Sequence, residues 1–345
     1  MSSKVQDEKP KKRAIAVNAT DRWVGNSIAH GLLKRENNYD DKETEIIALT
    51  RNPQSPNVKK LEREGAKIRE TNYTKKESLE RALQGVNTLV HLIEDDKNCV
   101  RFAEELVKAA KSQQVSNIIL ISFIGADEEL TDVHRIAHNV EKLLEKEFQN
   151  YKIIRLNWTH QCFFYFTKSI QEEGIIKMTL DAENERLNPI DFSDIVRAID
   201  DLVKNKEGCA NEKKIIYNLT GYKAFTPKDL VTMINDAIRP GRVEYRRVNN
   251  EELARYFRTL RSERKDIEYD PRRFFPLSDF EIKKLLDLLC YVKNGRDAGK
   301  SFDDFKEITG KEPKPVDYFF KENANEFTPK KNDLYRGRYR YFSRL

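Results

Sequence analysis

The sequence predicts an α/β protein with a doubly wound parallel sheet and a smaller, mostly helical second domain. In the first half of the chain, short apolar runs alternate regularly with segments of helical periodicity. This alternation is typical of right-handed crossovers between parallel strands. In the second half, helical patterns dominate. The predicted domains are 13–160, whose sheet is completed by about 188–222, and a second domain of 161–187 and 223–328, between tails at 1–12 and 329–345.

The first predicted strand, Ala14–Val17, is a short apolar run of the kind found in buried parallel sheets, and it directly follows a charged leader. The other strands are expected at 45–49, 67–70, 88–92, 117–121, 152–156, 188–190 and 214–219. Helices are expected between them at 25–34, 57–64, 76–84, 99–113 and 135–148. Thr226 followed by Pro227 predicts the start of a helix over 227–236. Further helices are expected at 251–260, 279–290, 303–309 and 315–323.

The composition, 39% apolar and 35% charged, indicates a highly solvated globular protein. No apolar run approaches the roughly 20 residues that span a bilayer, and the first residues lack the apolar core of a secretory signal. We therefore expect a cytoplasmic protein without a membrane partner. The net charge of +6 comes from the tails, because residues 1–13 carry +3, residues 331–345 carry +4, and the body between them carries −1. This distribution argues against a broad nucleic-acid-binding face.

The four cysteines, Cys99, Cys162, Cys209 and Cys290, lie at least 47 residues apart. This spacing excludes a C-x-x-C metal or redox motif, and we predict no metal site. Two interpretations stay open: four reduced structural thiols, or one exposed cysteine that forms a bond between molecules.

The turn after the first strand stands where a dinucleotide-binding protein keeps the glycines of its phosphate loop. Here the three glycine positions fall on Asn18, on Thr20 or Asp21, and on Val24, or on Gly25 with a one-residue slip. The glycines of such a loop allow a tight turn, a close approach of the pyrophosphate and close packing of the helix on the strand. A carboxylate at Asp21 would repel a phosphate about 5 Å away by roughly 3 kcal/mol at an effective dielectric near 20. The alternative is that Asp21 is an ordinary residue of a helix N-terminus.

Several blocks in the right order resemble one family, the NmrA-like proteins, a branch of the atypical short-chain dehydrogenases with a Rossmann-like fold. The blocks are Val17-Asn18-Ala19-Thr20, Ala48-Leu49-Thr50-Arg51-Asn52-Pro53, Gly85-Val86-Asn87, the segment 121–127 (ISFIGAD), the segment 188–195 (NPIDFSDI), Leu219-Thr220-Gly221 and the closing segment from Thr309 to Asn323. The resemblance covers roughly residues 13–328. It implies an NADP site in which Arg51 approaches the 2′-phosphate and Thr20 donates to the pyrophosphate.

The resemblance also implies catalysis by a tyrosine and a lysine four residues later. None of the 14 tyrosines has a lysine at that position, and the corresponding positions hold Val133 and Ala137. Ser122 is present, but a serine without the tyrosine and lysine is not a catalytic mechanism. His138 lies next to Ala137, and a single histidine on a charged helix is more typical of a surface residue. We therefore expect no catalytic residue and no bound cofactor, with Asn18, Thr20, Asp21 and Arg51 as vestigial positions. NADP is the expected cofactor if the site functions after all.

The last 15 residues interleave tyrosines with arginines, a composition favoured at protein interfaces and also able to stack on single-stranded nucleic acid. Together with the degenerate site, this segment favours a self-assembling structural protein, similar to crystal-forming NmrA-like proteins of fungal vacuoles, with itself as partner. The expected assembly contacts are Cys99, Cys162, Cys209, Cys290, Tyr335, Arg338, Tyr339 and Tyr341. Two alternatives stay open: an NADP-sensing regulatory protein that acts through a protein partner, and a residual NADPH-dependent reductase.

Overall fold

A computed structural model describes residues 13–38, 44–94, 96–204, 214–263, 277–297 and 299–330. Its centre is a seven-stranded sheet in the order β3-β2-β1-β4-β5-β6-β8, with every neighbouring pair parallel. These strands are β1 (Arg13–Val17), β2 (Thr44–Thr50), β3 (Lys67–Glu70), β4 (Thr88–Leu92), β5 (Asn117–Phe123), β6 (Tyr151–Leu156) and β8 (Ile216–Leu219). The predicted doubly wound parallel sheet is confirmed.

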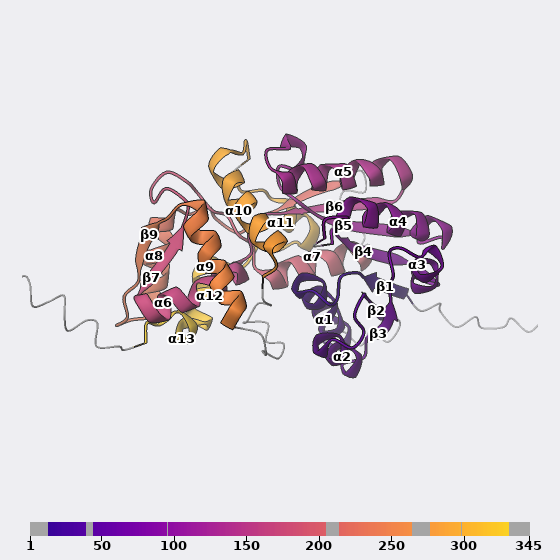
Figure 1. Cartoon of the computed structure of the whole chain (residues 1–345), viewed down its shortest axis with the longest axis horizontal. Helices are drawn as coiled ribbons and strands as arrows, with labels where there is room; N and C mark the ends of the chain where they lie inside the picture. The colour runs from indigo at the N-terminus through magenta and orange to yellow at the C-terminus, as the bar shows by residue number, and fades with distance from the viewer. Residues whose placement is uncertain are drawn as a thin grey trace, which may run out of the picture.

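Helices cover both faces of this sheet (Figure 1). The buried apolar side chains form two clusters, one on each face of the sheet. The helices α1 (Trp23–Asn38), α2 (Pro56–Arg63) and α7 (Phe192–Lys204) pack on one face. The helices α3 (Lys76–Leu83), α4 (Cys99–Ser112) and α5 (Asp132–Glu147) pack on the other. The strands β2, β4 and β5 are buried on both faces, which explains why they are nearly continuous apolar runs, whereas the edge strand β3 is partly exposed and mostly charged.

A smaller unit of helices surrounds a two-stranded parallel sheet, β7 (Ile175–Met178) with β9 (Glu244–Arg247) (Figure 1). Its other elements are η2 (His160–Phe166), α6 (Thr167–Glu173), α8 (Pro227–Ala237), α9 (Asn250–Glu263), α12 (Val316–Glu322) and α13 (Ala324–Phe327). Helix α8 begins as predicted, because Thr226 and Asp229 form a reciprocal capping box. The remaining elements are η1 (Ala126–Glu128), α10 (Asp279–Asn294) and α11 (Asp304–Thr309).

Residues 188–190 do not form the predicted strand. Ile190 makes only an isolated bridge to Thr159, because β6 and β8 pair directly with each other and leave no place in the sheet. The sequence analysis also missed α7, although Phe192, Ile195 and Ile199 are buried at helical spacing. It missed β7 and β9, which are only four residues long. None of the helices in the described ranges is both long and apolar enough to cross a membrane.

Candidate functional site

The order of the sheet reverses between β1 and β4, so the crevice for a ligand of this fold lies at the carboxyl ends of these two strands. The turn from β1 to α1 borders it. Ala19 has φ +55°, a left-handed conformation that favours glycine. A Cβ atom on Gly25 would lie 2.4 Å from the carbonyl oxygen of Ala19. Gly25, and not Val24, therefore occupies the third glycine position of the predicted loop, where it allows the helix to pack closely on the turn.

Asn18 links the two strands across this crevice. Its side-chain Oδ1 accepts a hydrogen bond from the Leu92 backbone N–H at 2.6 Å, and its Nδ2 donates to the Leu92 carbonyl at 3.0 Å. Asn18 is fully buried. A side chain thus holds the ends of β1 and β4 together at the first glycine position of the predicted loop, where a glycine would leave space.

Glu94 and Tyr73 fill the space next to Asn18. The Tyr73 hydroxyl donates to Glu94 Oε1 at 2.7 Å, and Asn18 Nδ2 lies 3.4 Å from the same oxygen. Glu94 is 2% exposed and Tyr73 5% exposed, and the Tyr73 ring stacks on Phe102. Burial, followed by the Glu94 charge, raises the pKa of Tyr73 well above its usual value, so the phenol stays a donor at neutral pH. The sequence analysis missed both residues.

Arg51, which the family resemblance places near a 2′-phosphate, is paired with carboxylates of the chain itself. Its Nη2 lies 3.5 Å from Glu94 Oε2, and its Nη1 lies 3.4 Å from Asp96 Oδ2. Burial by itself would lower the pKa of Arg51, but Glu94, Asp21 and Asp96 raise it above its usual value. Carboxylates of the chain itself therefore neutralise the Arg51 charge. The sequence contained a signal for this pairing, because the acidic run Glu94-Asp95-Asp96 follows β4 closely.

The two other vestigial positions do not form a phosphate cradle. Thr20 is fully buried, and its hydroxyl donates to the Leu49 carbonyl at 2.9 Å. In the structure the Thr20 hydroxyl therefore holds the turn against β2. Asp21 Oδ1 is buried and has no hydrogen-bond partner among the described residues. An unpaired carboxylate oxygen here would repel a phosphate bound at the turn.

Ser122, at the end of β5, belongs to a buried ion-pair network. Its hydroxyl donates to Glu141 Oε1 at 2.5 Å. Arg155 binds both oxygens of Glu141, through Nε at 2.9 Å and Nη2 at 2.6 Å, and reaches Asp127 through Nη1 at 2.7 Å. A bidentate pair of this kind fixes both side chains. The Ser122 hydroxyl is thereby held as a structural donor.

The other positions of the implied catalytic group carry no acid–base chemistry. Val133 and Ala137 lie on the buried side of α5, at 5% and 0% exposure. His138 Nε2 lies 3.6 Å from Glu129, and His138 is not among the residues that line the cavity described next. Among the described residues, no group of three or more His, Cys, Asp and Glu side chains is placed to hold a metal ion.

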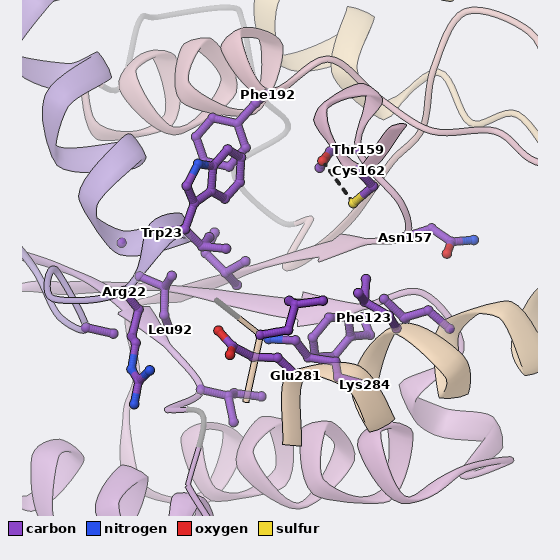
Figure 2. Close-up of a pocket in the computed structure, with 18 of the residues that line it drawn as sticks. Arg22, Trp23, Leu92, Phe123, Asn157, Thr159, Cys162, Phe192, Glu281 and Lys284 are labelled. Atoms are coloured by element: carbon purple, nitrogen blue, oxygen red, sulfur yellow. Dashed lines mark hydrogen bonds between the residues drawn. The ribbon is translucent and has the colours of Figure 1, made fainter. Parts of the chain in front are cut away.

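A cavity of about 140 Å³ lies between the β1–α1 turn, the carboxyl ends of β4 and β5, and helix α10 (Figure 2). Trp23 and Phe192 meet edge to face in its wall, with ring centroids 4.8 Å apart. Arg22, Glu281 and Lys284 are its charged lining residues among those described. The other lining residues are Ala19, Trp23, Val24, Gly25, Leu92, Ile93, Ile121, Phe123, Asn157, Thr159, Cys162, Tyr165, Phe192, Leu277, Leu285 and Leu288.

Helix α10 closes one side of the cavity and lies between α5 and α9 (Figure 1). The Tyr291 hydroxyl donates to Glu128 Oε1 at 2.8 Å. The Tyr291 ring lies so close to Gly125 and Gly295 that a Cβ atom on either glycine would be about 2 Å from it, at 2.0 and 2.2 Å. Ring and glycines together fix α10 against η1. The sequence predicted this helix but not its place over the cleft.

The expected assembly contacts separate into three groups. Cys99 is 2% exposed, so it cannot form a bond between molecules while the protein is folded. Cys162 lines the cavity, and Thr159 Oγ1 lies 3.5 Å from its sulfur. Cys290 is half-buried, near the end of α10. Cys209, Tyr335, Arg338, Tyr339 and Tyr341 lie outside the described residues.

Fold and site together define an NAD(P)-binding-type protein with an altered cleft. A sequence model of the NAD(P)H-binding family matches residues 23–205, more than half of the chain, so the chain belongs to this family. The match begins at Trp23, just beyond the altered turn. No curated protein sequence matches the chain. Family membership agrees with the resemblance of the sequence blocks, and it makes a nicotinamide cofactor the ordinary ligand of such a cleft.

Solved structures share the fold over nearly the whole chain. An NADPH-dependent quinone oxidoreductase from Escherichia coli, complexed with NADPH, is 19% identical with a TM-score of 0.68 and covers 90% of this chain and 99% of its own. A triphenylmethane reductase from Citrobacter sp., complexed with NADP(H), is 20% identical with a TM-score of 0.69 and the same coverage. A nucleoside-diphosphate-sugar epimerase from Staphylococcus aureus is 18% identical with a TM-score of 0.67. Identities this low show the fold alone, and these comparisons give no support to the narrower likeness to a vacuolar crystal protein.

Proposed function

We propose that this chain is a non-catalytic member of the NAD(P)H-binding family that acts by association, foremost with copies of itself, and not by hydride transfer. The observation that carries the proposal is that the Arg51 guanidinium already pairs with two carboxylates, with Glu94 Oε2 at 3.5 Å from Nη2 and Asp96 Oδ2 at 3.4 Å from Nη1. A 2′-phosphate would have to compete with two carboxylates for this guanidinium. The Ser122 hydroxyl, already bound to Glu141, supports the same conclusion for catalysis.

Self-assembly is the form of association that we propose, and the arginine- and tyrosine-rich segment 331–345 supports it. Tyrosine and arginine contribute large contact areas and hydrogen bonds at protein interfaces. Cys290 is the described cysteine best placed to take part, because it is neither in the core nor in the cavity.

A second candidate is an NADP-sensing protein that acts on a protein partner. Arg51 keeps 26% of its side chain exposed, and two structures of the same fold hold NADPH or NADP(H). In this case the cofactor would displace Asp96, the more exposed of the two carboxylates, from the guanidinium.

Two measurements on the full chain test the proposal. Isothermal titration with NADP⁺ and NADPH is expected to show no saturation at micromolar ligand, because the carboxylates oppose the phosphates. Sedimentation over a range of concentrations is expected to show oligomers, and reductant dissociates them only if Cys290 or Cys209 links the copies. Micromolar saturation favours the sensing role. Oxidation of NADPH by a quinone at a turnover typical of enzymes would establish a residual reductase and overturn the proposal.

A further inference from the structure

We propose that Asp191, Asp194 and Lys314 form a proton-controlled clasp where helix α7 meets the segment that leads into α12, and that the clasp is closed when Asp194 holds a proton. Residues of η2, of the first turn of α7 and of the segment 311–315 converge there. Both η2 and α12 belong to the smaller unit, whereas α7 packs on the parallel sheet. The clasp therefore lies between the two units, and none of its residues lines the cavity beneath α10.

Two carboxylates are buried together at the start of α7. Asp191, just before the helix, is 7% exposed, and Asp194, in its first turn, is 4% exposed. A buried carboxylate is costly unless its charge is compensated. Each carboxylate also disfavours the charged form of the other, so the environments of the two decide which one ionises first.

Asp191 receives most of the compensation. Its Oδ1 accepts hydrogen bonds from the Ser193 backbone N–H at 2.9 Å and from the Ser193 hydroxyl at 2.5 Å. Its Oδ2 accepts one from Gln161 Nε2 at 3.0 Å and lies 3.5 Å from His160 Nδ1. Burial by itself would raise the pKa of Asp191, but His160, Ser193 and Lys314 hold it well below its usual value. Asp191 is therefore the charged member of the pair.

Asp194 is compensated much less. Its Oδ2 accepts a hydrogen bond from the Lys314 backbone N–H at 2.7 Å, but the Lys314 ammonium donates to Ser193 Oγ at 2.8 Å. Burial raises the pKa of Asp194 to about 6, because burial and the Asp191 charge together outweigh the opposing effect of Lys314. A proton on Asp194 removes the uncompensated charge, and this proton is exchanged near neutral pH.

Other charged groups around α7 are engaged elsewhere. The groups that act on Asp194 are Asp191, His160 and Lys314. Helices α11 and α1 also pack on α7. Their charged side chains form ion pairs of their own: Asp304 and Glu307 with Lys214, Lys306 with Glu312, Arg35 with Asp200 and Asp201, and His30 with Glu64.

The sequence makes the donor of the clasp rigid. Residues 312–315 read Glu-Pro-Lys-Pro, so Lys314 carries the single backbone N–H between Pro313 and Pro315. A proline fixes its own φ angle and restricts the preceding residue to extended conformations. Pro315 is also the N-cap residue of α12, with φ −66°. The Lys314 N–H is thus held in place between the turn and the helix, and its bond to Asp194 fixes the path of the chain into α12.

Opening of the clasp is local, because aromatic side chains hold α12 independently. Phe319 and Phe320 are 5% and 0% exposed. The Phe320 ring packs on Phe163 and the Phe319 ring on Phe164, with centroids 5.3 and 5.2 Å apart. We therefore expect the segment 311–316 to loosen while α12 stays in place.

The direction and size of the effect follow from the two states of Asp194. In the open state the carboxyl group meets water and has its usual pKa of 3.8, whereas in the closed state the pKa is about 6. Closure is therefore favoured most below pH 3.8, and the advantage is lost as the pH rises through 6. These two values give a closing equilibrium about tenfold weaker at pH 7 than at pH 5, with little further change above pH 7.

Hydrogen exchange of the Lys314 amide, followed by NMR on the full chain from pH 5 to pH 8, tests the proposal. After correction for the pH dependence of intrinsic exchange, we expect about tenfold less protection at pH 7 than at pH 5. The Phe320 amide, in the middle of α12, should keep its protection. Protection of Lys314 that does not change with pH, or an equal loss at Phe320, overturns the proposal.

Three variants identify the group that titrates. Asp194→Asn keeps an oxygen for the Lys314 N–H without a charge, and should give equal protection at pH 5 and pH 7. Asp317→Asn, which removes an exposed carboxylate paired with Lys321, is the matched control and should keep the tenfold change. Lys314→Met keeps the backbone N–H but loses the ammonium, so its change should exceed tenfold, even if Asp194→Asn does not fold. A tenfold change in Asp194→Asn, or no larger change in Lys314→Met, contradicts the inference.

The carboxyl carbon of Asp194 gives a second readout that does not depend on opening. Its resonance, assigned by its absence in Asp194→Asn, should titrate with a midpoint near pH 6. A midpoint near pH 4 would show that Asp194 is charged in the closed clasp, and would overturn the proposal.

Discussion

Replacing Glu94 with glutamine tests whether the carboxylates around Arg51 close the 2′-phosphate site. Glutamine keeps a side-chain oxygen that can accept the hydrogen bonds from Tyr73 and Asn18, and it removes only the charge. We expect the variant to fold like the original chain. Its guanidinium then keeps the ion pair with Asp96, which is 28% exposed.

The size of the effect follows from the distances. Glu94 Oε2 lies 3.5 Å from Arg51 Nη2. A phosphate bound to the same guanidinium would lie about 6 Å from that carboxylate, where two unit charges at an effective dielectric near 20 repel by roughly 3 kcal/mol. Removing the Glu94 charge should therefore raise the affinity for a 2′-phosphate about a hundredfold at low salt, and less at high salt, because ions screen such charges.

Calorimetric titration with 2′,5′-ADP measures this effect without the nicotinamide half. We expect the original chain to bind at millimolar concentration or more weakly, and Glu94→Gln to bind in the range of tens of micromolar. The double variant Glu94→Gln/Arg51→Gln should lose the gain, and Glu105→Gln, an exposed partner of Lys108, should show none. A folded Glu94→Gln variant with unchanged affinity, or micromolar binding by the original chain, refutes the reasoning.

Three further predictions concern the scaffold around the site, and urea unfolding measures each of them. Burial lowers the pKa of His91 to about 4, so below pH 6.5 the unfolded chain takes up a proton that the folded chain refuses. The free energy of unfolding should therefore fall by about 3 kcal/mol between pH 6.5 and pH 4 because of His91. The His91→Leu variant should lack this part of the decline, and parallel pH profiles of the variant and the original chain would contradict the prediction. Glu141→Ala should cost about 3 kcal/mol, because it leaves the buried Arg155 without its bidentate partner; a loss below 1 kcal/mol would show that Asp127 suffices. Gly25→Ala should cost about 2–3 kcal/mol, because the new methyl group would lie 2.4 Å from the Ala19 oxygen; an unchanged unfolding midpoint would mean that the turn yields freely.

The sheet was predictable because its signals are local. Each central strand is an apolar run buried on both faces, and the helices between the strands carry their apolar residues at helical spacing. The segment 188–190 also looked like a strand in the sequence, but β6 pairs directly with β8. The segment therefore makes only an isolated bridge, from Ile190 to Thr159. β7 and β9 were missed because they lie outside the regular strand–helix alternation of the first half and pair only with each other in a separate two-stranded sheet.

The sequence by itself determined which groups the cleft contains: no glycine at Asn18, a carboxylate at Asp21, a retained Arg51 and no tyrosine–lysine pair. Only the tertiary structure decided what these groups do. Arg51 follows β2 and Glu94 follows β4, and their pairing depends on the carboxyl ends of β2, β1 and β4 lying side by side. Helix α10 comes more than 150 residues after β4 in the sequence, and its place over the cavity follows from packing against α5 and α9. A local pattern specifies a strand or a helix, whereas the contacts between distant elements decide whether the cleft is open to a ligand or filled by the chain itself.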